Sequence, residues 1–402
     1  MPKDYLTSLP PELFDCICQL VVTAKPKQYL GGISKAFLST SRRLCFATTT
    51  VRSFQRLQQL CRLVSESSGV AFFVKELRLH LEGEDIGQPR AKELATLFGS
   101  LTSTTHLEIE GSARIAKMVL APKTAGQYLP KLVSLCLLDP FHGWANPFAP
   151  DHYANLKHYP HFNVLELTVR RSRASLGRYQ QRGRLPDWRP WGWWLSLRGP
   201  ILGNPAVHDL LSWFEYPEGL YLHETEPLTA TESLDSLLDC LPEPDGLRWL
   251  SLASFGGQAN MAQALTKFNL SYGLEFRSGA YHRDCLPVIS KMQELEELSF
   301  YDNLCITIRD LTTLITGPDK LASLVKVELH NVWDRWKEEE WIDDFGYELE
   351  RYGGWSSEFS LSGLAELLKI ADEEGVEFEG LAVSLARERL ADRRLIEQVS
   401  RP

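Results

Sequence analysis

Residues 273–300 read GLEFRSGAYHRDCLPVISKMQELEELSF and show how the fold is built. The stretch opens and closes on short alternating segments, Gly273–Phe276 and Glu297–Phe300, of the kind that form β-strands. Between them, Cys285–Met292 carries apolar residues at helical spacing. The first leucines of the two strands, at positions 274 and 298, are 24 residues apart. The stretch therefore predicts a strand, a helix and a second strand parallel to the first.

The same theme recurs along most of the chain. The predicted strands share a leucine-x-leucine-like pattern and are Glu76–Leu79, His106–Ile109, Ser134–Leu137, Val164–Leu167, Gly219–Leu222, Trp249–Leu252, Gly273–Phe276, Glu297–Phe300, Lys326–Leu329 and Gly380–Val383. Helical patterns lie between strands at Ala91–Leu101, Thr231–Leu241, Cys285–Met292 and Ser362–Ala371. Most spacings between successive strands are 24 to 30 residues, which is typical of leucine-rich repeats.

These repeats predict the α/β class, with an irregular leucine-rich-repeat solenoid over residues 71–390. In such a horseshoe each repeat buries its apolar face on its neighbours. The consensus asparagine is irregular, so the repeats are divergent. An ordinary doubly wound α/β domain is the competing fold, but the near-equal strands come without a glycine-rich phosphate loop. Two spacings, 55 residues before position 220 and 54 before position 381, indicate a degenerate strand or an insertion.

Alternate strand residues of a horseshoe point to its concave face. The residues expected there are Arg78, Glu108, Glu166, Tyr221, Ser251, Glu275, Ser299 and Glu328. Four of these eight are glutamates and one is an arginine, which favours a basic partner. The alternative is an ordinary solvated face.

Arginine and tryptophan gather in residues 170–198, RRSRASLGRYQQRGRLPDWRPWGWWLSLR. The segment falls in the 55-residue gap and predicts an insertion at 170–217. Arginine and tryptophan dominate binding hot spots. The candidate substrate-binding residues are Arg178, Arg182, Arg184, Trp188, Trp191 and Trp193. In the alternative, the tryptophans pack on the solenoid and the arginines pair with acids such as those of residues 338–350. Stacking of single-stranded nucleic acid is disfavoured by the acidic chain.

The N-terminal segment, residues 6–22, reads LTSLPPELFDCICQLVV and predicts an amphipathic helix. Further short helices are expected up to about residue 50, and a helical linker follows at 51–70. The apolar stripe of the first helix packs against either the first repeat or a partner. A segment of about 45 residues buries too little apolar surface to fold stably alone.

This segment resembles the F-box. The resemblance lies in Leu9-Pro10-x-Glu12-Leu13, then Ile17 and Leu20, then Ile33-Ser34-Lys35-x-Phe37 and Arg42-Arg43-Leu44. It covers about residues 5–50, and together with the repeats it resembles the F-box and leucine-rich-repeat proteins that are frequent in fungi. The resemblance implies a surface for the Skp linker subunit, which connects F-box proteins to the cullin. By position, its contacts are Leu9, Pro10, Leu13, Ile17 and Leu20.

Composition and motifs exclude several other classes. The formal charge of −9 argues against a nucleic-acid binder, and no apolar run is long enough to span a membrane. Eight cysteines without a C-x-x-C pair indicate a reducing compartment, so a cytoplasmic or nuclear location is expected. Histidines at 142, 152, 158 and 161 lie beside Asp151 in a proline-containing loop, and they lack the fixed spacing and cysteine help of a zinc site. The sequence holds none of the common catalytic motifs.

We therefore expect a non-catalytic adaptor without a cofactor or metal. Its parts are an F-box module at 1–50, a linker at 51–70, the solenoid at 71–390 and a tail at 391–402. The resemblance implies the substrate-recognition subunit of a Skp–cullin–F-box ubiquitin ligase, with an unidentified protein as target. The alternative is a repeat scaffold for protein interactions, in which the N-terminal helices cap the solenoid.

Overall fold

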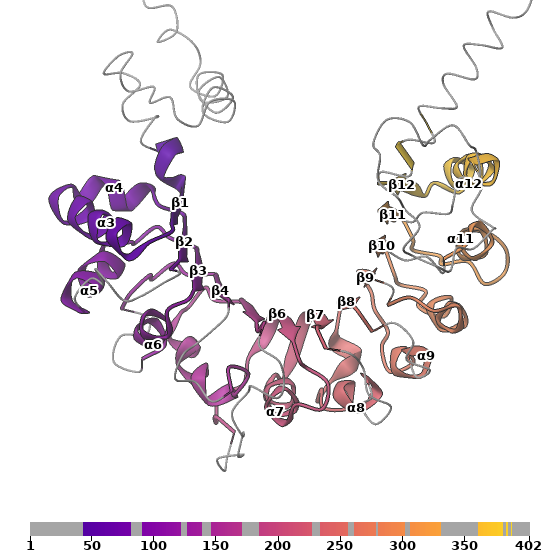
Figure 1. Cartoon of the computed structure of the whole chain (residues 1–402). Helices are drawn as coiled ribbons and strands as arrows, with labels where there is room; N and C mark the ends of the chain where they lie inside the picture. The colour runs from indigo at the N-terminus through magenta and orange to yellow at the C-terminus, as the bar shows by residue number, and fades with distance from the viewer. Residues whose placement is uncertain are drawn as a thin grey trace, which may run out of the picture. The chain divides into compact units, whose positions relative to one another are not determined.

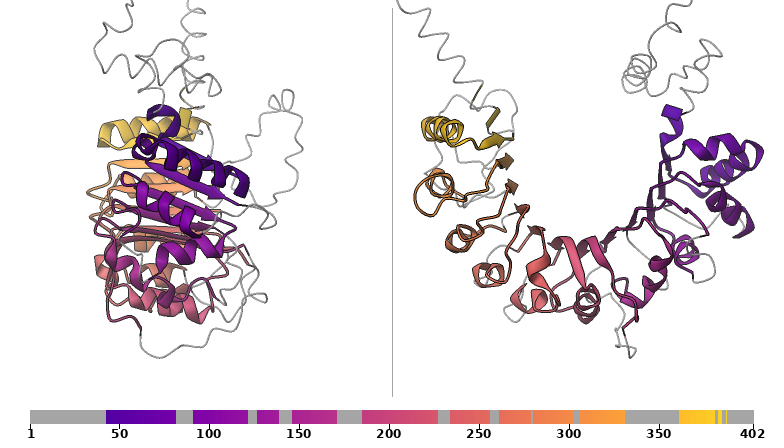
Figure 2. Two further views of the ribbon diagram at one scale, coloured as in Figure 1. Left: turned by 90° about the vertical axis from the view of Figure 1, so that its left-hand side faces the viewer. Right: turned by 180° about the vertical axis from the view of Figure 1, so that it is seen from behind.

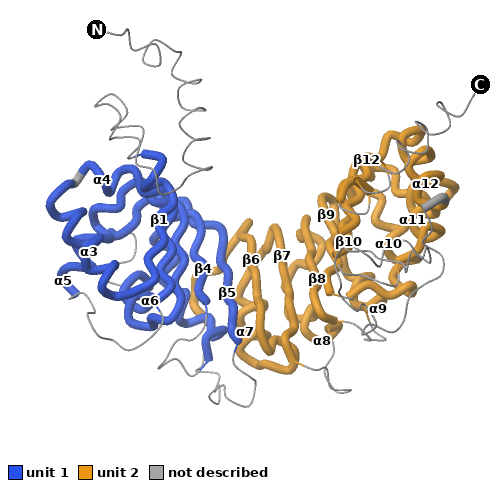
Figure 3. The backbone as a smooth tube through the Cα atoms, turned by 45° about the horizontal axis from the view of Figure 1, so that its top comes forward, with its two compact units in different colours: residues 1–171, 176–180 blue, residues 172–175, 181–402 orange. Residues whose placement is uncertain are grey.

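A computed structural model describes the fold of most of the solenoid. The described residues are 43–81, 91–121, 127–138, 146–170, 185–226, 234–255, 261–278, 280–301, 306–330, 361–380, 383–384 and 387. They fall into two compact units, and the change from unit 1 to unit 2 lies between residues 170 and 185 (Figures 1 and 3).

The part of unit 1 that the structure describes forms five parallel strands that pair in chain order. They are β1 (Thr48–Val51), β2 (Glu76–His80), β3 (His106–Glu110), β4 (Ser134–Leu138) and β5 (Val164–Thr168). The strands pair without a register shift, so Leu77, Leu107, Leu135 and Leu165 stand side by side. All four are buried. This row of leucines explains the leucine-x-leucine pattern, because each repeat covers the apolar residues of the previous one.

Helical segments follow the strands of unit 1. They are α3 (Phe54–Glu66), α4 (Ser68–Phe73), α5 (Ala91–Ser100), α6 (Ala113–Leu120) and two 3₁₀ turns, η3 (Pro150–His152) and η4 (Ala154–His158). α3 begins at residue 54 because the Ser53 hydroxyl accepts a hydrogen bond from the Arg56 N–H at 3.3 Å. Its face with Leu57 and Val64 is buried. Because β1 pairs with β2 and α3 packs against α5, the repeats already begin at Thr48, earlier than the predicted boundary at residue 70.

The described residues of unit 2 form seven parallel strands, again paired in chain order. They are β6 (Trp191–Gly199), β7 (Tyr216–Glu224), β8 (Trp249–Ala253), β9 (Gly273–Arg277), β10 (Glu297–Tyr301), β11 (Lys326–His330) and β12 (Glu377–Glu379). From β7 to β12 the register is regular, and Leu220, Leu250, Leu274 and Leu298 form a buried row. Between β6 and β7 the register shifts twice, around Trp193.

Helical segments also connect the strands of unit 2. They are α7 (Pro205–Trp213), α8 (Leu234–Leu238), η6 (Pro244–Gly246), α9 (Met261–Leu265), η7 (Arg283–Cys285), α10 (Leu286–Ile289), α11 (Ile308–Ile315) and α12 (Leu361–Glu374). α7 starts with Pro205 in its first turn and an Asn204 side chain that caps the Ala206 N–H. α11 starts with a capping box between Thr307 and Asp310.

In each unit the described helices lie on one side of the strands and leave the opposite strand face without a helical cover (Figure 2). Nine of the ten predicted strands are confirmed. The tenth prediction, at 380–383, was displaced: the strand is β12, Glu377–Glu379. The structure thus confirms an α/β solenoid of the leucine-rich-repeat type. No described helix is long and apolar enough to cross a membrane.

Candidate protein-binding surfaces

The uncovered face of each unit is formed by alternate strand residues. In β2, for example, Leu77 and Leu79 are buried while Glu76, Arg78 and His80 remain partly exposed. All eight residues predicted for a concave face lie in register on these uncovered faces. Their exposure differs between the two units, because the neighbouring side chains differ in length.

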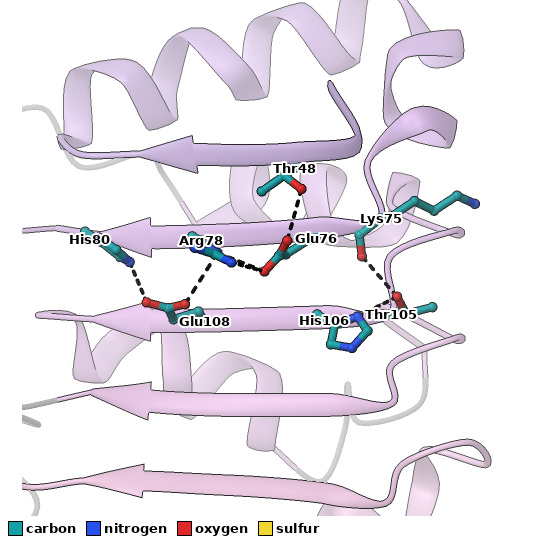
Figure 4. Close-up of polar contacts among 8 residues, drawn as sticks. All are labelled: Thr48, Lys75, Glu76, Arg78, His80, Thr105, His106 and Glu108. Atoms are coloured by element: carbon teal, nitrogen blue, oxygen red, sulfur yellow. Dashed lines mark hydrogen bonds and ion pairs between the residues drawn. The ribbon is translucent and has the colours of Figure 1, made fainter. Parts of the chain in front are cut away.

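On unit 1 the uncovered face carries a network of charged side chains (Figure 4). The Arg78 guanidinium donates to Glu76 Oε1 from Nη2 at 2.6 Å and lies 3.6 Å from Glu108 Oε2. The other oxygen of Glu108 is 2.6 Å from His80 Nε2. On the neighbouring strand Thr48 Oγ1 donates to the second carboxylate oxygen of Glu76 at 3.0 Å. The network spans β1 to β3 and fixes these side chains in one arrangement.

Within this network, Arg78 and Thr48 stabilise the charged form of Glu76. Burial pushes the pKa of Glu76 upward, but the hydrogen bonds from Arg78 and Thr48 outweigh it and lower the pKa overall. The Arg78 pKa is correspondingly raised by Glu76. Farther along the face, Arg170 pairs with Glu110 at 3.0 Å. Arg78 and Arg170 thus offset part of the negative charge that Glu76, Glu108 and Glu110 place on this face.

On unit 2 the middle of the uncovered face is closed by long side chains. The Arg277 guanidinium lies 4.3 Å from the ring centroid of Tyr301 and 5.9 Å from that of Tyr221, and it also pairs with Glu275. Beneath these side chains Glu275 is only 5% exposed. Ser251 and Ser299 are also buried. These three residues lie on the uncovered face, as predicted, but they are buried there and present almost no surface to a partner.

Histidines and tyrosines surround this closed region. Burial, followed by repulsion from Arg198 and Arg277, lowers the pKa of His223. Its Nε2 lies 3.2 Å from Ser254 Oγ. Tyr301 donates a hydrogen bond of 2.7 Å to Glu328, and its ring stacks on His330 with centroids 4.5 Å apart. Burial and this hydrogen bond raise the pKa of Tyr301, so the phenol stays protonated.

The described part of the predicted insertion is a regular repeat. β6 and α7 occupy residues 191–213, so the 55-residue gap holds a strand that the sequence pattern concealed. Trp193 is 5% exposed and packs edge-on against Trp188 and Phe214. Trp188 is partly buried, and its carbonyl accepts a hydrogen bond from the Trp213 indole N–H. Trp193 was thus wrongly chosen as a binding residue, because it belongs to the core.

The remaining predicted binding residues divide into two groups. Trp191 is 70% exposed, which suits a role in binding. Arg178, Arg182 and Arg184 lie outside the described residues. The five residues predicted to contact the Skp linker also lie outside them; they are Leu9, Pro10, Leu13, Ile17 and Leu20. The acidic segment at 338–350 and His142 lie outside them too.

An aromatic patch lies at the start of the strands of unit 2, and sequence reasoning found only Trp191 of its members. The patch consists of Trp191, Trp194, Tyr216, Trp249 and Tyr272. Trp191 stacks on Tyr216 with ring centroids 5.7 Å apart and an interplanar angle of 26°. Trp194 and Trp249 are 6.2 Å apart, and Trp249 and Tyr272 are 5.7 Å apart. Trp194 is 37% exposed, so the patch presents aromatic surface to solvent.

Glycines on the next strand or turn make this arrangement possible. A Cβ built on Gly219 would lie 2.3 Å from the Trp194 ring, and one on Gly273 would lie 2.1 Å from the Trp249 ring. Gly246 has the same relation to Tyr216, at 1.9 Å. Each of these rings therefore lies directly on a glycine backbone. The regular spacing of tryptophan and glycine in successive repeats was the signal in the sequence that could have revealed the patch.

Comparisons with known proteins give limited information. Neither a protein-family model nor a curated protein matches the sequence. Among solved structures, one titled "Crystal structure of Rad7 and Elc1 complex in yeast" matches with 16% sequence identity and a TM-score of 0.39. The match covers 80% of this chain and 83% of that chain. The repeat fold rests on the strand register described above.

Proposed function

We propose that the protein is the substrate-recognition adaptor of a Skp–cullin–F-box ubiquitin ligase. The observation that carries the proposal is the order of two features along the chain. Residues 5–50 resemble the F-box, and the repeats start at its C-terminal end, where β1 (Thr48–Val51) overlaps the last residues of that stretch. A linker-binding module followed by a repeat scaffold with an uncovered strand face is the arrangement that an adaptor requires.

In this function the N-terminal segment binds the Skp linker through Leu9, Pro10, Leu13, Ile17 and Leu20. Through the linker the chain is held on the cullin. The uncovered faces of the repeats bind the target protein. The adaptor itself performs no chemistry, since it accelerates ubiquitin transfer by holding the target near the loaded enzyme.

Binding to the purified Skp linker tests this proposal. Isothermal titration of the full-length chain should give a tight complex, and the Leu9→Ala/Pro10→Ala variant should weaken it more than about tenfold. The reason is that truncating apolar anchors at a packed interface costs on the order of 2 kcal/mol each. A matched control is Thr23→Ala/Gln28→Ala, which changes the same segment outside the motif and should bind as the wild type does.

The alternative function, a repeat scaffold without a ligase role, predicts a different result. In that case the wild-type chain does not bind the linker. Leu9→Ala/Pro10→Ala then lowers the stability of the solenoid, because the N-terminal helices act as its cap. Thermal unfolding of both variants, measured beside the titration, therefore separates the two functions.

A further inference from the structure

Two tryptophan rings of the aromatic patch lie over glycines of the next strand, Trp194 over Gly219 and Trp249 over Gly273. Trp191 is 70% and Trp194 37% exposed, so both present aromatic surface to solvent, while Trp249 is partly buried. The face of an indole carries the negative part of the ring quadrupole and attracts cations. Tryptophan is the best side chain for this interaction.

Acidic side chains border the patch. The carboxylate of Glu297, then partial burial, and then the carboxylate of Glu296 raise the pKa of the Tyr272 phenol. Glu297 stands beside Gly273 in the strand register, next to the ring of Trp249. The rings and the carboxylates therefore favour a positively charged group at the same place.

The chain itself shows how a cation binds here. The Arg248 guanidinium lies 5.8 Å from the ring centroid of Tyr272, while its Nη1 donates to Glu218 at 2.9 Å. Arg248 thus uses an aromatic face and a carboxylate of this surface together. The exposed Trp191 and Trp194, with the partly buried Trp249 beside Glu297, offer further aromatic and acidic groups to cations from outside.

We infer that the aromatic patch binds an extended, lysine- or arginine-rich segment of a partner protein. Ring centroids along the patch are 5.7 to 6.2 Å apart. Alternate side chains of an extended strand are separated by about 6.6 Å, which matches this spacing. Successive basic side chains on one side of the segment can then lie on successive rings. That this partner is a ligase target rests on the proposed function, whereas the binding chemistry does not.

Fluorescence anisotropy with the full-length chain tests the inference. The probe is a fluorescein-labelled lysine-rich peptide, and its counterpart with every lysine acetylated serves as the neutral control. We expect the lysine peptide to bind and the acetylated peptide to bind at least about fivefold more weakly. Trp194→Ala/Trp249→Ala should weaken the lysine peptide at least about fivefold, although the charge of the chain is unchanged.

Two further variants separate the aromatic faces from general effects. Trp194→Leu/Trp249→Leu keeps apolar side chains but removes the π-faces, and it should lose the lysine peptide as the alanine variant does. Phe72→Ala removes another exposed aromatic residue, 60% exposed on α4 of unit 1, and should bind like the wild type. Circular dichroism of each variant checks that the fold is retained.

Three results would overturn the inference: equal binding of the acetylated peptide, full binding by the leucine variant, or loss of binding by Phe72→Ala. The Skp-linker titration, repeated on the patch variants, keeps the two proposals apart. Peptide binding without linker binding removes the ligase role and leaves the patch in place. Linker binding without peptide binding removes the inference about the patch and leaves the ligase role in place.

Discussion

Replacing Gly273 by alanine should displace Trp249 and destabilise unit 2. The new Cβ would lie 2.1 Å from both Cε3 and Cζ3 of the Trp249 ring, whereas ordinary contacts begin near 3.4 Å. The ring must therefore retreat by more than an ångström from the sheet. Overpacking of this kind costs about 1–3 kcal/mol. The backbone itself is no obstacle, because Gly273 lies in a regular β-strand that alanine adopts readily.

Urea denaturation followed by circular dichroism measures this cost. Gly69→Ala is the matched control, since a Cβ on Gly69 meets nothing within 4 Å and the residue lies in helix α4. This control should be neutral or stabilised by about 0.5–1 kcal/mol, because alanine favours a helix over glycine. Gly273→Ala should thus lower the free energy of unfolding, whereas Gly69→Ala should leave it unchanged or raise it.

A double-mutant cycle with Trp249→Ala identifies the cause. If the indole is what the new methyl group meets, Gly273→Ala should cost almost nothing in the Trp249→Ala background, which gives a coupling of about 1–3 kcal/mol. An unchanged cost in that background, or a Gly273→Ala protein as stable as Gly69→Ala, would refute the assignment of the ring to the glycine surface.

Three further predictions concern the core, the histidines and the thiols. Leu274→Ala should lower the free energy of unfolding by about 2–5 kcal/mol in urea denaturation, because the side chain is fully buried. Leu63 is 37% exposed, so Leu63→Ala should lower the free energy of unfolding much less. Equal losses in the two variants would contradict the buried leucine row. Since burial and two nearby arginines lower the folded-state pKa of His223, the unfolded chain takes up more protons as the pH falls through about 6.5. Stability is therefore lost below that pH, and His223→Gln should lose less of it between about pH 7 and 5; an identical pH profile would show that the histidine is not buried. Burial raises the pKa values of Cys61 and Cys285 to about 11, so both thiols should be unreactive in the native protein at about pH 8. Replacing either by serine should therefore leave the number of thiols that Ellman's reagent titrates in the native protein unchanged. After unfolding, the same replacement should lower the number of titrated thiols by one.

The strands that the sequence predicted are those whose leucines fill the buried rows. β6 was not predicted, because its segment is rich in arginine and tryptophan and its leucines, Leu195 and Leu197, follow three tryptophans. β12 was not located correctly, because Phe378 is the only buried residue of this strand. Periodicity finds a strand only where enough of its positions are apolar.

The candidate surface was harder to predict than the fold. In β6 the buried Trp193 and the exposed Trp194 follow simple alternation with the buried Leu195 and Leu197, so a strand assignment would have placed Trp193 in the core. Only the exposed Trp191 departs from this alternation, where the register shifts and Gly192 has a positive φ. Glu275 pairs with Arg277 of its own strand, but Arg277 also lies over Tyr221 and Tyr301 of other strands, which the sequence of a single strand does not reveal.

The proposed function requires that this chain connects a target to a cullin through the Skp linker. The most direct measurement is size-exclusion chromatography of the full-length chain with purified cullin, with and without the linker. We predict that the chain elutes with the cullin only when the linker is present, and that Leu9→Ala/Pro10→Ala abolishes this co-elution. Separate elution of the wild-type chain in the presence of the linker would contradict the adaptor function.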